Sequence, residues 1–314
     1  MEELHDHPNI LKSIRLLRKR RSTAQCKGFD VANQEFDVHL TTAPFHLIEY
    51  WENGNFLSYL KNQDALPENM VTFYAEQLLG CMEYVHYMGY AHMDVKLDNI
   101  LLDNGFKIKL SDFGSAVKIG DQPTIGFRRG TPKYMAPEVF DLKKGETFDA
   151  YKADIYSMGV WIYLMLFKRF PVHETGPYPA TKDLLENPSL WKTCPFDCGA
   201  DQWESLSTEI KCILIACLNR DSKERPTSSE LISHFYLPTF DENIDEDVFS
   251  EMQTRRAKYE QDRHEKQLQQ KEFAQPDVPG KLQCDMMWPQ EIHHDNPHYH
   301  KSGNSTYAST NSKN

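Results

Sequence analysis

The chain has 314 residues, of which 40% are hydrophobic and 26% are charged, so one large domain or two small ones with a packed core can form. Its formal net charge of -11 argues against a nucleic-acid partner, because phosphate backbones are bound by clustered Lys and Arg. The seven cysteines are odd in number and scattered, so they predict no disulfide framework, and no basic-then-apolar leader opens the chain. We therefore expect an intracellular protein, cytoplasmic with the nucleus also allowed.

Residues 1–50 form a small strand region. Two apolar runs, NILKSIRLL at 9–17 and PFHLIEY at 44–50, are typical of strands. A polar, basic stretch over 18–35 joins them, and we interpret it as a loop.

Residues 51–238 form a helical body. The segment 70–90 places apolar side chains at helical spacing. The run GVWIYLMLF at 159–167 is too short to span a bilayer, which predicts a buried core helix and no membrane partner. The stripe that we expect to be buried in the first of these segments consists of Val71, Tyr74, Leu78, Met82 and Val85.

Residues 239–314 form a polar tail. A charged, Gln-rich run gives way to a His-, Asn- and Ser-rich end with few aliphatic residues. This composition predicts disorder, apart from one exposed helix near 250–272. That helix is too polar and too acidic to resemble a calmodulin target, but the tail could bind another regulatory partner.

Two short acidic motifs flank a predicted hairpin after the first long helix. HMDVKLDNILL at 92–102 leads into the turn DNG at 103–105, and FKIKLSDFG at 106–114 follows it. One motif therefore lies just before the hairpin and the other just after it. This geometry brings together Asp94, Lys96, Asn99 and Asp112.

These four side chains suit phosphoryl transfer. A carboxylate and an amide oxygen are ligands that Mg²⁺ accepts, and this ion is usually shared with substrate phosphates. A second carboxylate can take a hydroxyl proton, and a lysine can balance phosphate charge.

The order of motifs along the chain resembles the eukaryotic protein kinase superfamily. The resemblance covers residues 5–237 and implies an α+β, kinase-like fold with a mainly helical C-terminal lobe and an incomplete N-terminal β lobe. GTPKYMAPEV is similar to the calmodulin-dependent and AMP-activated branch. The matching segments are H-x-D-x-x-x-x-N at 92–99, DFG at 112–114, GTPKYM at 130–135, APE at 136–138, the buried helix from 154, and the end of the large lobe at 219–237.

The resemblance implies a role for each motif residue. Asp94 would accept the proton of the substrate hydroxyl, and Lys96 would contact the transferred phosphate. Asn99 and Asp112 would hold Mg²⁺. Lys96 together with Thr131 is similar to serine/threonine kinases, which implies protein substrates with Ser or Thr acceptors.

Other matching positions imply structural or nucleotide-binding roles. His92 would brace the loop rather than carry protons, and Asp154 would cap the loop backbone. Glu138 and Arg225 would form a buried ion pair. The stretch HLIEYWENGNF is similar to the hinge that binds adenine, so the residues that we expect to contact ATP are Ile48, Glu49, Trp51 and Leu101.

Two departures from the family pattern leave two functions open. Met93 replaces the arginine that couples the loop to an activation-loop phosphate, for which Arg128 and Arg129 could partly substitute, and no G-x-G stands anywhere in the chain. No lysine aligns with the small-lobe lysine either. The first hypothesis is an ATP- and Mg²⁺-dependent serine/threonine kinase. The alternative is a catalytically impaired, kinase-like module that binds a protein partner.

The pair Cys194 and Cys198 could suggest half of a zinc site. No second pair at suitable spacing accompanies it, so we interpret these as incidental cysteines.

Overall fold

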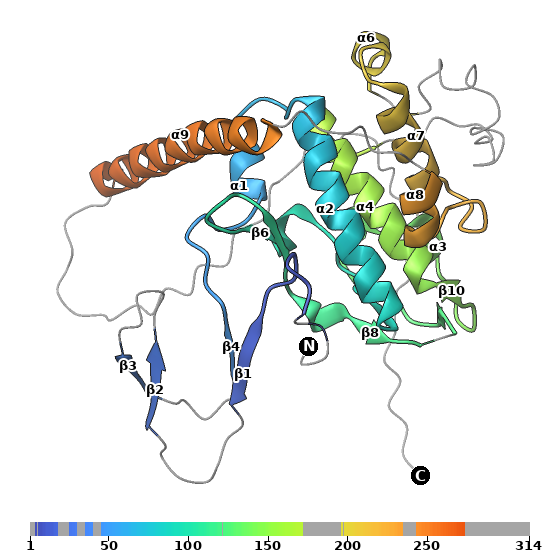
Figure 1. Cartoon of the computed structure of the whole chain (residues 1–314), viewed down its shortest axis with the longest axis horizontal. Coiled ribbons are helices and arrows are strands. Elements are labelled where there is room, and N and C mark those ends of the chain that lie inside the picture. The colour runs from blue at the N-terminus through green and yellow to red at the C-terminus, as the bar shows by residue number, and fades with distance from the viewer. Residues whose placement is uncertain are drawn as a thin grey trace, which may run out of the picture. The chain divides into compact units, whose positions relative to one another are not determined.

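The computed structural model describes residues 4, 6–17, 25–29, 35–39, 45–120, 122–171, 196, 198–234 and 243–273. The described residues up to Leu268 belong to one compact unit (Figure 1). The helices of the described residues are α1 (Leu57–Leu60), α2 (Glu68–Tyr87), α3 (Pro137–Phe140), α4 (Ala150–Phe167), α6 (Ala200–Glu204), α7 (Thr208–Cys217), α8 (Ser228–His234) and α9 (Ile244–Phe273). Their strands are β1 (Ser13–Leu17), β2 (Gln25–Phe29), β3 (Glu35–His39), β4 (Phe45–Ile48), β5 (Tyr90–Ala91), β6 (Ile100–Leu102), β7 (Ile108–Leu110), β8 (Val117–Lys118), β9 (Thr124–Ile125) and β10 (Phe148–Asp149).

The strand region contains two antiparallel pairs. β1 and β4 lie in the two apolar runs that predict strands, and they pair with each other, with a register shift between Ser13 and Arg15. β2 pairs with β3, so the interpretation of 18–35 as a loop was wrong for Gln25–Phe29, and the described residues of this region contain four strands. The sequence carried a signal for β3, because Phe36 and Val38 alternate with charged or polar neighbours in EFDVH.

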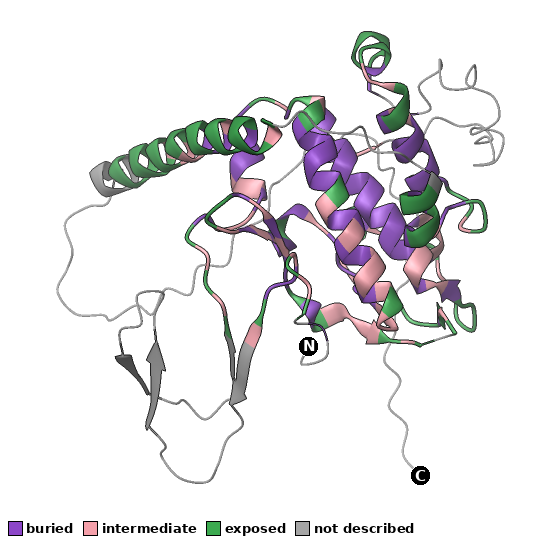
Figure 2. Cartoon of the chain, in the orientation of Figure 1, coloured by how far each residue is buried: buried purple, intermediate pink, exposed green. Residues whose placement is uncertain are grey.

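Helices α2 and α4 form the centre of the core. All five residues of the predicted stripe on α2 are fully buried. In α4 every side chain from Ala153 to Phe167 is buried, which confirms the predicted core helix (Figure 2). The α4 helix starts where the Asp149 carboxylate accepts a hydrogen bond from the Lys152 N–H at 3.1 Å, which satisfies one of the free donors of the first turn.

Gly159 allows α4 and α7 to lie unusually close. A Cβ atom at this position would stand 2.7 Å from the Cβ atom of Cys217 on α7. Because real Cβ contacts are never this short, only glycine fits here without moving a helix.

Short strand pairs connect these helices to the loops between them. β6 and β7 form the predicted antiparallel hairpin, with Ile100 opposite Leu110. The segment 49–56, which we call the linker, joins β4 to α1 and runs beside β6. The Phe56 N–H donates to the Ile100 carbonyl at 2.8 Å, and the Leu102 N–H donates to the Gly54 carbonyl at 2.9 Å.

Helix α9 lies where an exposed helix was expected, but it is longer and partly buried. Val248, Met252 and Arg255 are each at most 5% exposed. Within the part of the chain that the structure describes, no helix is both long and apolar enough to cross a membrane.

The structure corrects the interpretation of one cysteine. Cys198 is disulfide-bonded and is therefore not an incidental thiol. Cys194 lies outside the described residues.

Candidate active site

The backbone of the loop after β5 is fixed by one carboxylate from α4. The N–H groups of His92 and Met93 each donate to the Asp154 carboxylate at 2.7 Å. The imidazole of His86 on α2 lies 3.1 Å from the same carboxylate. Since Asp154 is only 1% exposed, these donors compensate its lost hydration and join two core helices to the loop.

His92 braces the loop in one tautomer. Its Nε2 lies 3.0 Å from the Ser111 carbonyl, which can only accept, and its Nδ1 lies 3.2 Å from the backbone N–H of Asp94, which can only donate. Burial lowers the pKa of His92, although Asp154 and the Ser111 carbonyl act in the opposite direction. The ring is therefore neutral at pH 7 and protonated only at Nε2, which suits a bracing role.

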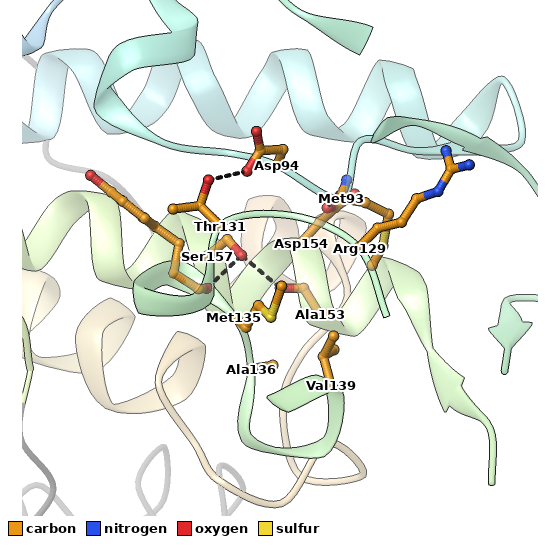
Figure 3. Close-up of a pocket in the computed structure, with 11 residues that line it drawn as sticks. Met93, Asp94, Arg129, Thr131, Met135, Ala136, Val139, Ala153, Asp154 and Ser157 are labelled. Atoms are coloured by element: carbon orange, nitrogen blue, oxygen red, sulfur yellow. Dashed lines mark hydrogen bonds between the residues drawn. The ribbon is translucent and has the colours of Figure 1, made fainter. Parts of the chain in front are cut away.

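Asp94, Lys96 and Thr131 form a closed triangle of hydrogen bonds. The Lys96 ammonium donates to Asp94 Oδ2 and to Thr131 Oγ1, both at 2.8 Å, and the Thr131 hydroxyl donates to Asp94 Oδ1 at 2.7 Å. Figure 3 shows the Thr131 hydroxyl pointing at the Asp94 carboxylate. Burial raises the pKa of Asp94, but the hydrogen bonds from Lys96, Thr131 and Asn99 outweigh this and lower the pKa below its ordinary value.

Asn99 links this triangle to the exit of the hairpin. Its Nδ2 donates to the Asp94 carbonyl at 2.8 Å and to Asp94 Oδ2 at 3.1 Å. The N–H and the hydroxyl of Ser111 both donate to the Asn99 carbonyl at 2.8 Å. The sequence reasoning missed Ser111, because a serine after a strand has no distinguishing signal of its own.

Asp112 follows Ser111 in a left-handed conformation with φ of 55°. Its exposed carboxylate accepts a hydrogen bond from the Gly114 N–H at 3.2 Å. Because the side-chain nitrogen of Asn99 donates to Asp94, its amide oxygen remains as an acceptor. An amide oxygen and a carboxylate fit the hard-oxygen preference of Mg²⁺. Among the residues that the structure describes, no group of three or more His, Cys, Asp or Glu side chains could hold a metal ion.

Gly130 allows the segment before Thr131 to approach the loop. Its φ is +100°, and a Cβ atom there would stand 2.1 Å from the Met93 carbonyl oxygen. Only glycine fits this position without moving the backbone. The sequence reasoning missed Gly130, although a glycine directly before a predicted site residue could have signalled such an approach.

A small cavity opens beside the triangle, between the loop and α4 (Figure 3). Met93, Asp94 and Arg129 line it together with residues of the 131–139 segment and α4. Arg129 donates to the Ser115 carbonyl at 3.4 Å, and Arg128 donates to the Val139 carbonyl at 3.1 Å. Their substitution for the arginine that Met93 replaces stays a prediction.

Glu138 and Arg225 form an ion pair behind the site. Arg225 Nη1 lies 2.7 Å from Glu138 Oε1, and Nη2 lies 3.2 Å from Oε2. The fully buried guanidinium also donates to the carbonyls of Asn219 and Lys152. The pair therefore connects α3 to the chain that precedes α8, with its donors compensating the burial of charge.

The predicted nucleotide-binding residues lie at the end of β4, in the linker and in β6. Ile48 is 47% exposed. Glu49 exchanges two hydrogen bonds with the backbone of Lys12, one through its N–H at 3.1 Å and one through its carboxylate at 2.8 Å. Leu101 forms a bridge with Asn55 of the linker, and the ring of Trp51 lies 5.3 Å from the Lys109 ammonium. Contact of these residues with ATP stays a prediction.

Residues 1–237 match the family model of the protein kinase domain. Because this match covers more than half of the chain, the chain belongs to the protein kinase superfamily. The predicted superfamily and the predicted fold class, α+β with an incomplete N-terminal β lobe, are thereby confirmed.

Several curated kinases are similar to this chain. Mitogen-activated protein kinase kinase kinase 2 of Arabidopsis thaliana is 33% identical over 194 residues, which are 61% of this chain and 28% of that protein. Citron Rho-interacting kinase of Homo sapiens is 41% identical over 133 residues, which are 41% of this chain and 7% of that protein. Mitogen-activated protein kinase kinase 7 of Arabidopsis thaliana is 29% identical over 233 residues, which are 73% of this chain and 70% of that protein. The chain thus spans less than a third of the length of the first two relatives, and the predicted calmodulin-dependent or AMP-activated branch stays a prediction.

Proposed function

We propose that the chain is an ATP- and Mg²⁺-dependent protein serine/threonine kinase, which transfers the γ-phosphate of ATP to Ser or Thr hydroxyls of protein substrates. The observation that carries the proposal is the triangle of Asp94, Lys96 and Thr131. It holds an ionised carboxylate and an ammonium group 2.8 Å apart, and Asp94 and Thr131 line a small cavity.

Each residue of the site has a chemical role in this proposal. The substrate hydroxyl oxygen forms a bond to the γ-phosphorus, the bond from that phosphorus to the bridging oxygen breaks, and ADP leaves with the electron pair. Asp94 orients the hydroxyl and takes its proton, because a carboxylate that accepts from Lys96, Asn99 and Thr131 still has one free lone pair, on Oδ1. Lys96 stabilises the charge on the transferred group.

Asn99 and Asp112 would hold Mg²⁺, which neutralises phosphate charge when it is bound. Ile48, Glu49, Trp51 and Leu101 would contact ATP. These assignments extend the family match to particular residues of this chain.

We also propose the boundaries and the surroundings of the domain. Residues 1–50 would be the small-lobe part and residues 51–238 the large lobe, with a tail at 239–314 that could bind a regulatory partner. The partners would be proteins rather than nucleic acid or membrane, in the cytoplasm or the nucleus.

The alternative is a catalytically impaired, kinase-like module that binds a protein partner. Two observations favour it. Met93 occupies the position of the arginine that couples the loop to an activation-loop phosphate. Ile48 and Tyr50 are 47% and 65% exposed, so they offer apolar surface to a partner.

The test is phosphate transfer from labelled ATP with Mg²⁺ to mixed protein substrates, with Asp112→Asn beside the unaltered chain. Asp98→Asn is the matched control, because Asp98 is an exposed carboxylate in the loop that carries Asp94 and Asn99. Transfer that Asp112→Asn abolishes and Asp98→Asn preserves would support the kinase.

Transfer that survives in Asp112→Asn would come from a contaminant and would count against the proposal. If the folded chain is silent, the same assay is made after fusion to a complete kinase small lobe. Activity of that fusion would support the kinase, whereas a silent fusion would favour the binding module.

A further inference from the structure

Helix α9 begins after residue 237, where the family match ends, yet its first half is part of the core. The residues that face the lobe recur at helical spacing. Val248 and Met252 are 1% and 0% exposed and belong to the hydrophobic core, and Ile244 packs against it. The polar composition of the tail concealed this stripe, because most of its other residues are charged.

Arg255 continues the stripe as a buried cation that closes the loop after α1. It is 5% exposed and donates to the carbonyls of Tyr59, Asp64 and Ala65 at 3.3, 2.8 and 3.2 Å. The last carbonyls of a helix lack partners within the helix, so the guanidinium supplies a donor to the Tyr59 carbonyl of α1, and its other two bonds hold the loop that follows. In return, Gln63 donates through Nε2 to the Arg255 carbonyl at 2.8 Å.

The charge of Arg255 is compensated within α9. Its Nε lies 2.7 Å from the carboxylate of Glu251, one helical turn earlier. A buried guanidinium with one carboxylate and three carbonyls around it has its donors directed in fixed positions. These contacts set where the loop after α1 lies against α9.

Arg256 extends the connection to the linker through Asn53. The guanidinium donates to the side-chain oxygen of Asn53, which is 7% exposed. Asn53 Nδ2 donates in turn to the Asp103 carbonyl at 2.6 Å, and the Tyr59 hydroxyl donates to the Asn53 carbonyl at 2.9 Å. The side-chain oxygen, the side-chain nitrogen and the backbone carbonyl of Asn53 are therefore each bonded to a different segment.

This connection ends at the turn of the β6–β7 hairpin. Asn99 precedes that hairpin and Asp112 follows it. The Asp103 N–H donates to the Lys107 carbonyl at 2.9 Å and closes that turn. Phe106 of the turn packs edge-on against Phe249 of α9, with ring centroids 5.4 Å apart. α9 thus contacts both the linker and the hairpin.

We propose that α9 is a clamp that sets the linker against the β6–β7 hairpin, and that Arg255 and Arg256 are positioning residues for nucleotide binding. The part of this proposal that concerns ATP binding rests on the proposed function. The functional domain then extends beyond residue 238, to the end of the docked part of α9.

The clamp is tested by hydrogen exchange of backbone amides and by ATP affinity in the full chain. The variants are Arg255→Met and Arg256→Met, with Arg263→Met as the matched control, because Arg263 is an exposed arginine on the same helix. Arg256 is only partly buried, so its variant keeps the test valid if Arg255→Met fails to fold. Amides of α4 report global unfolding in the same experiment.

We expect exchange of amides 53–66 to rise by about tenfold or more in both variants, because each loses charge-assisted hydrogen bonds. Exchange in α4 should stay unchanged in Arg256→Met. ATP affinity should fall severalfold in both variants and stay unchanged in Arg263→Met. Arg255→Lys should restore little, because an ammonium group cannot reproduce the planar fork that meets three carbonyls.

Unchanged exchange at 53–66 in Arg256→Met would overturn the clamp. Equal acceleration in α4 and in 53–66 would also overturn it, since the arginines would then support only general stability. If the unaltered chain binds no ATP while the local exchange effect is present, the proposed function fails and the clamp stands. If ATP binds with the same affinity in every variant, the proposed function survives and the positioning role fails.

Discussion

The substitution Thr131→Val removes one hydroxyl from the site and little else, because the two side chains have nearly the same shape. In the structure that hydroxyl donates to Asp94 at 2.7 Å and accepts from Lys96 at 2.8 Å. A hydrogen bond to a charged group contributes about 1.5–3 kcal/mol. Lys96 is partly exposed and can turn toward water, so we count only the bond to Asp94. The expected loss of kcat/KM is then about 10- to 150-fold.

The pH dependence of the same variant provides a second measurement. Burial raises the pKa of Asp94, while hydrogen bonds that include the one from Thr131 lower it further than burial raises it. Removal of the hydroxyl therefore raises the pKa, and the acidic limb of the rate profile should move to higher pH. Thr131→Ser keeps the hydroxyl and serves as the control. Equal rates and equal acidic limbs in the Val and Ser variants would refute the role of the triangle.

Three further changes test the parts of the protein around the triangle. Gly130→Ala should destabilise the fold by at least about 2 kcal/mol, measured by urea unfolding, because a Cβ atom would stand 2.1 Å from the Met93 carbonyl oxygen at a φ of +100°. Arg225→Met should cost about 3–5 kcal/mol, because Glu138 loses its partner; a change below about 1 kcal/mol would contradict the structural importance of this pair. Burial lowers the pKa of His92 in the folded state, so its contribution to stability is complete above the ordinary value of 6.5 and is lost as pH falls below it. The urea concentration at the unfolding midpoint should therefore decrease as the pH is lowered from 7 to 5.5. His92→Asn should weaken this pH dependence.

The helical body and the hairpin could be predicted because their patterns are local. The stripe on α2 repeats at helical spacing, and the turn after Leu102 has the residue types that a tight turn needs. The hairpin then determines which motif residues lie near one another. For this reason the sequence could place Asp94 and Asn99 in one network, although it could not give the partners of their individual atoms.

The remaining features depend on contacts between distant segments. The partner of Asn53 on α9 is 203 positions away, and no local pattern indicates such a contact. Strand β2 has few apolar residues, so its pairing with β3 had little support in composition. The clamp was missed because Arg255 looks like any surface arginine until its carbonyl partners are seen.

The close approach of α4 and α7 at Gly159 also determines the chemistry of a thiol. Cys217 is fully buried behind that contact, and burial raises its pKa to about 12. Almost no thiolate is present at pH 7, and the thiolate is the form that reacts with alkylating reagents and oxidants. The side chain is therefore inert while the two helices stay together. Labelling of Cys217 would count only those molecules in which the helices have separated, so the protein carries its own chemical reporter of the integrity of its core.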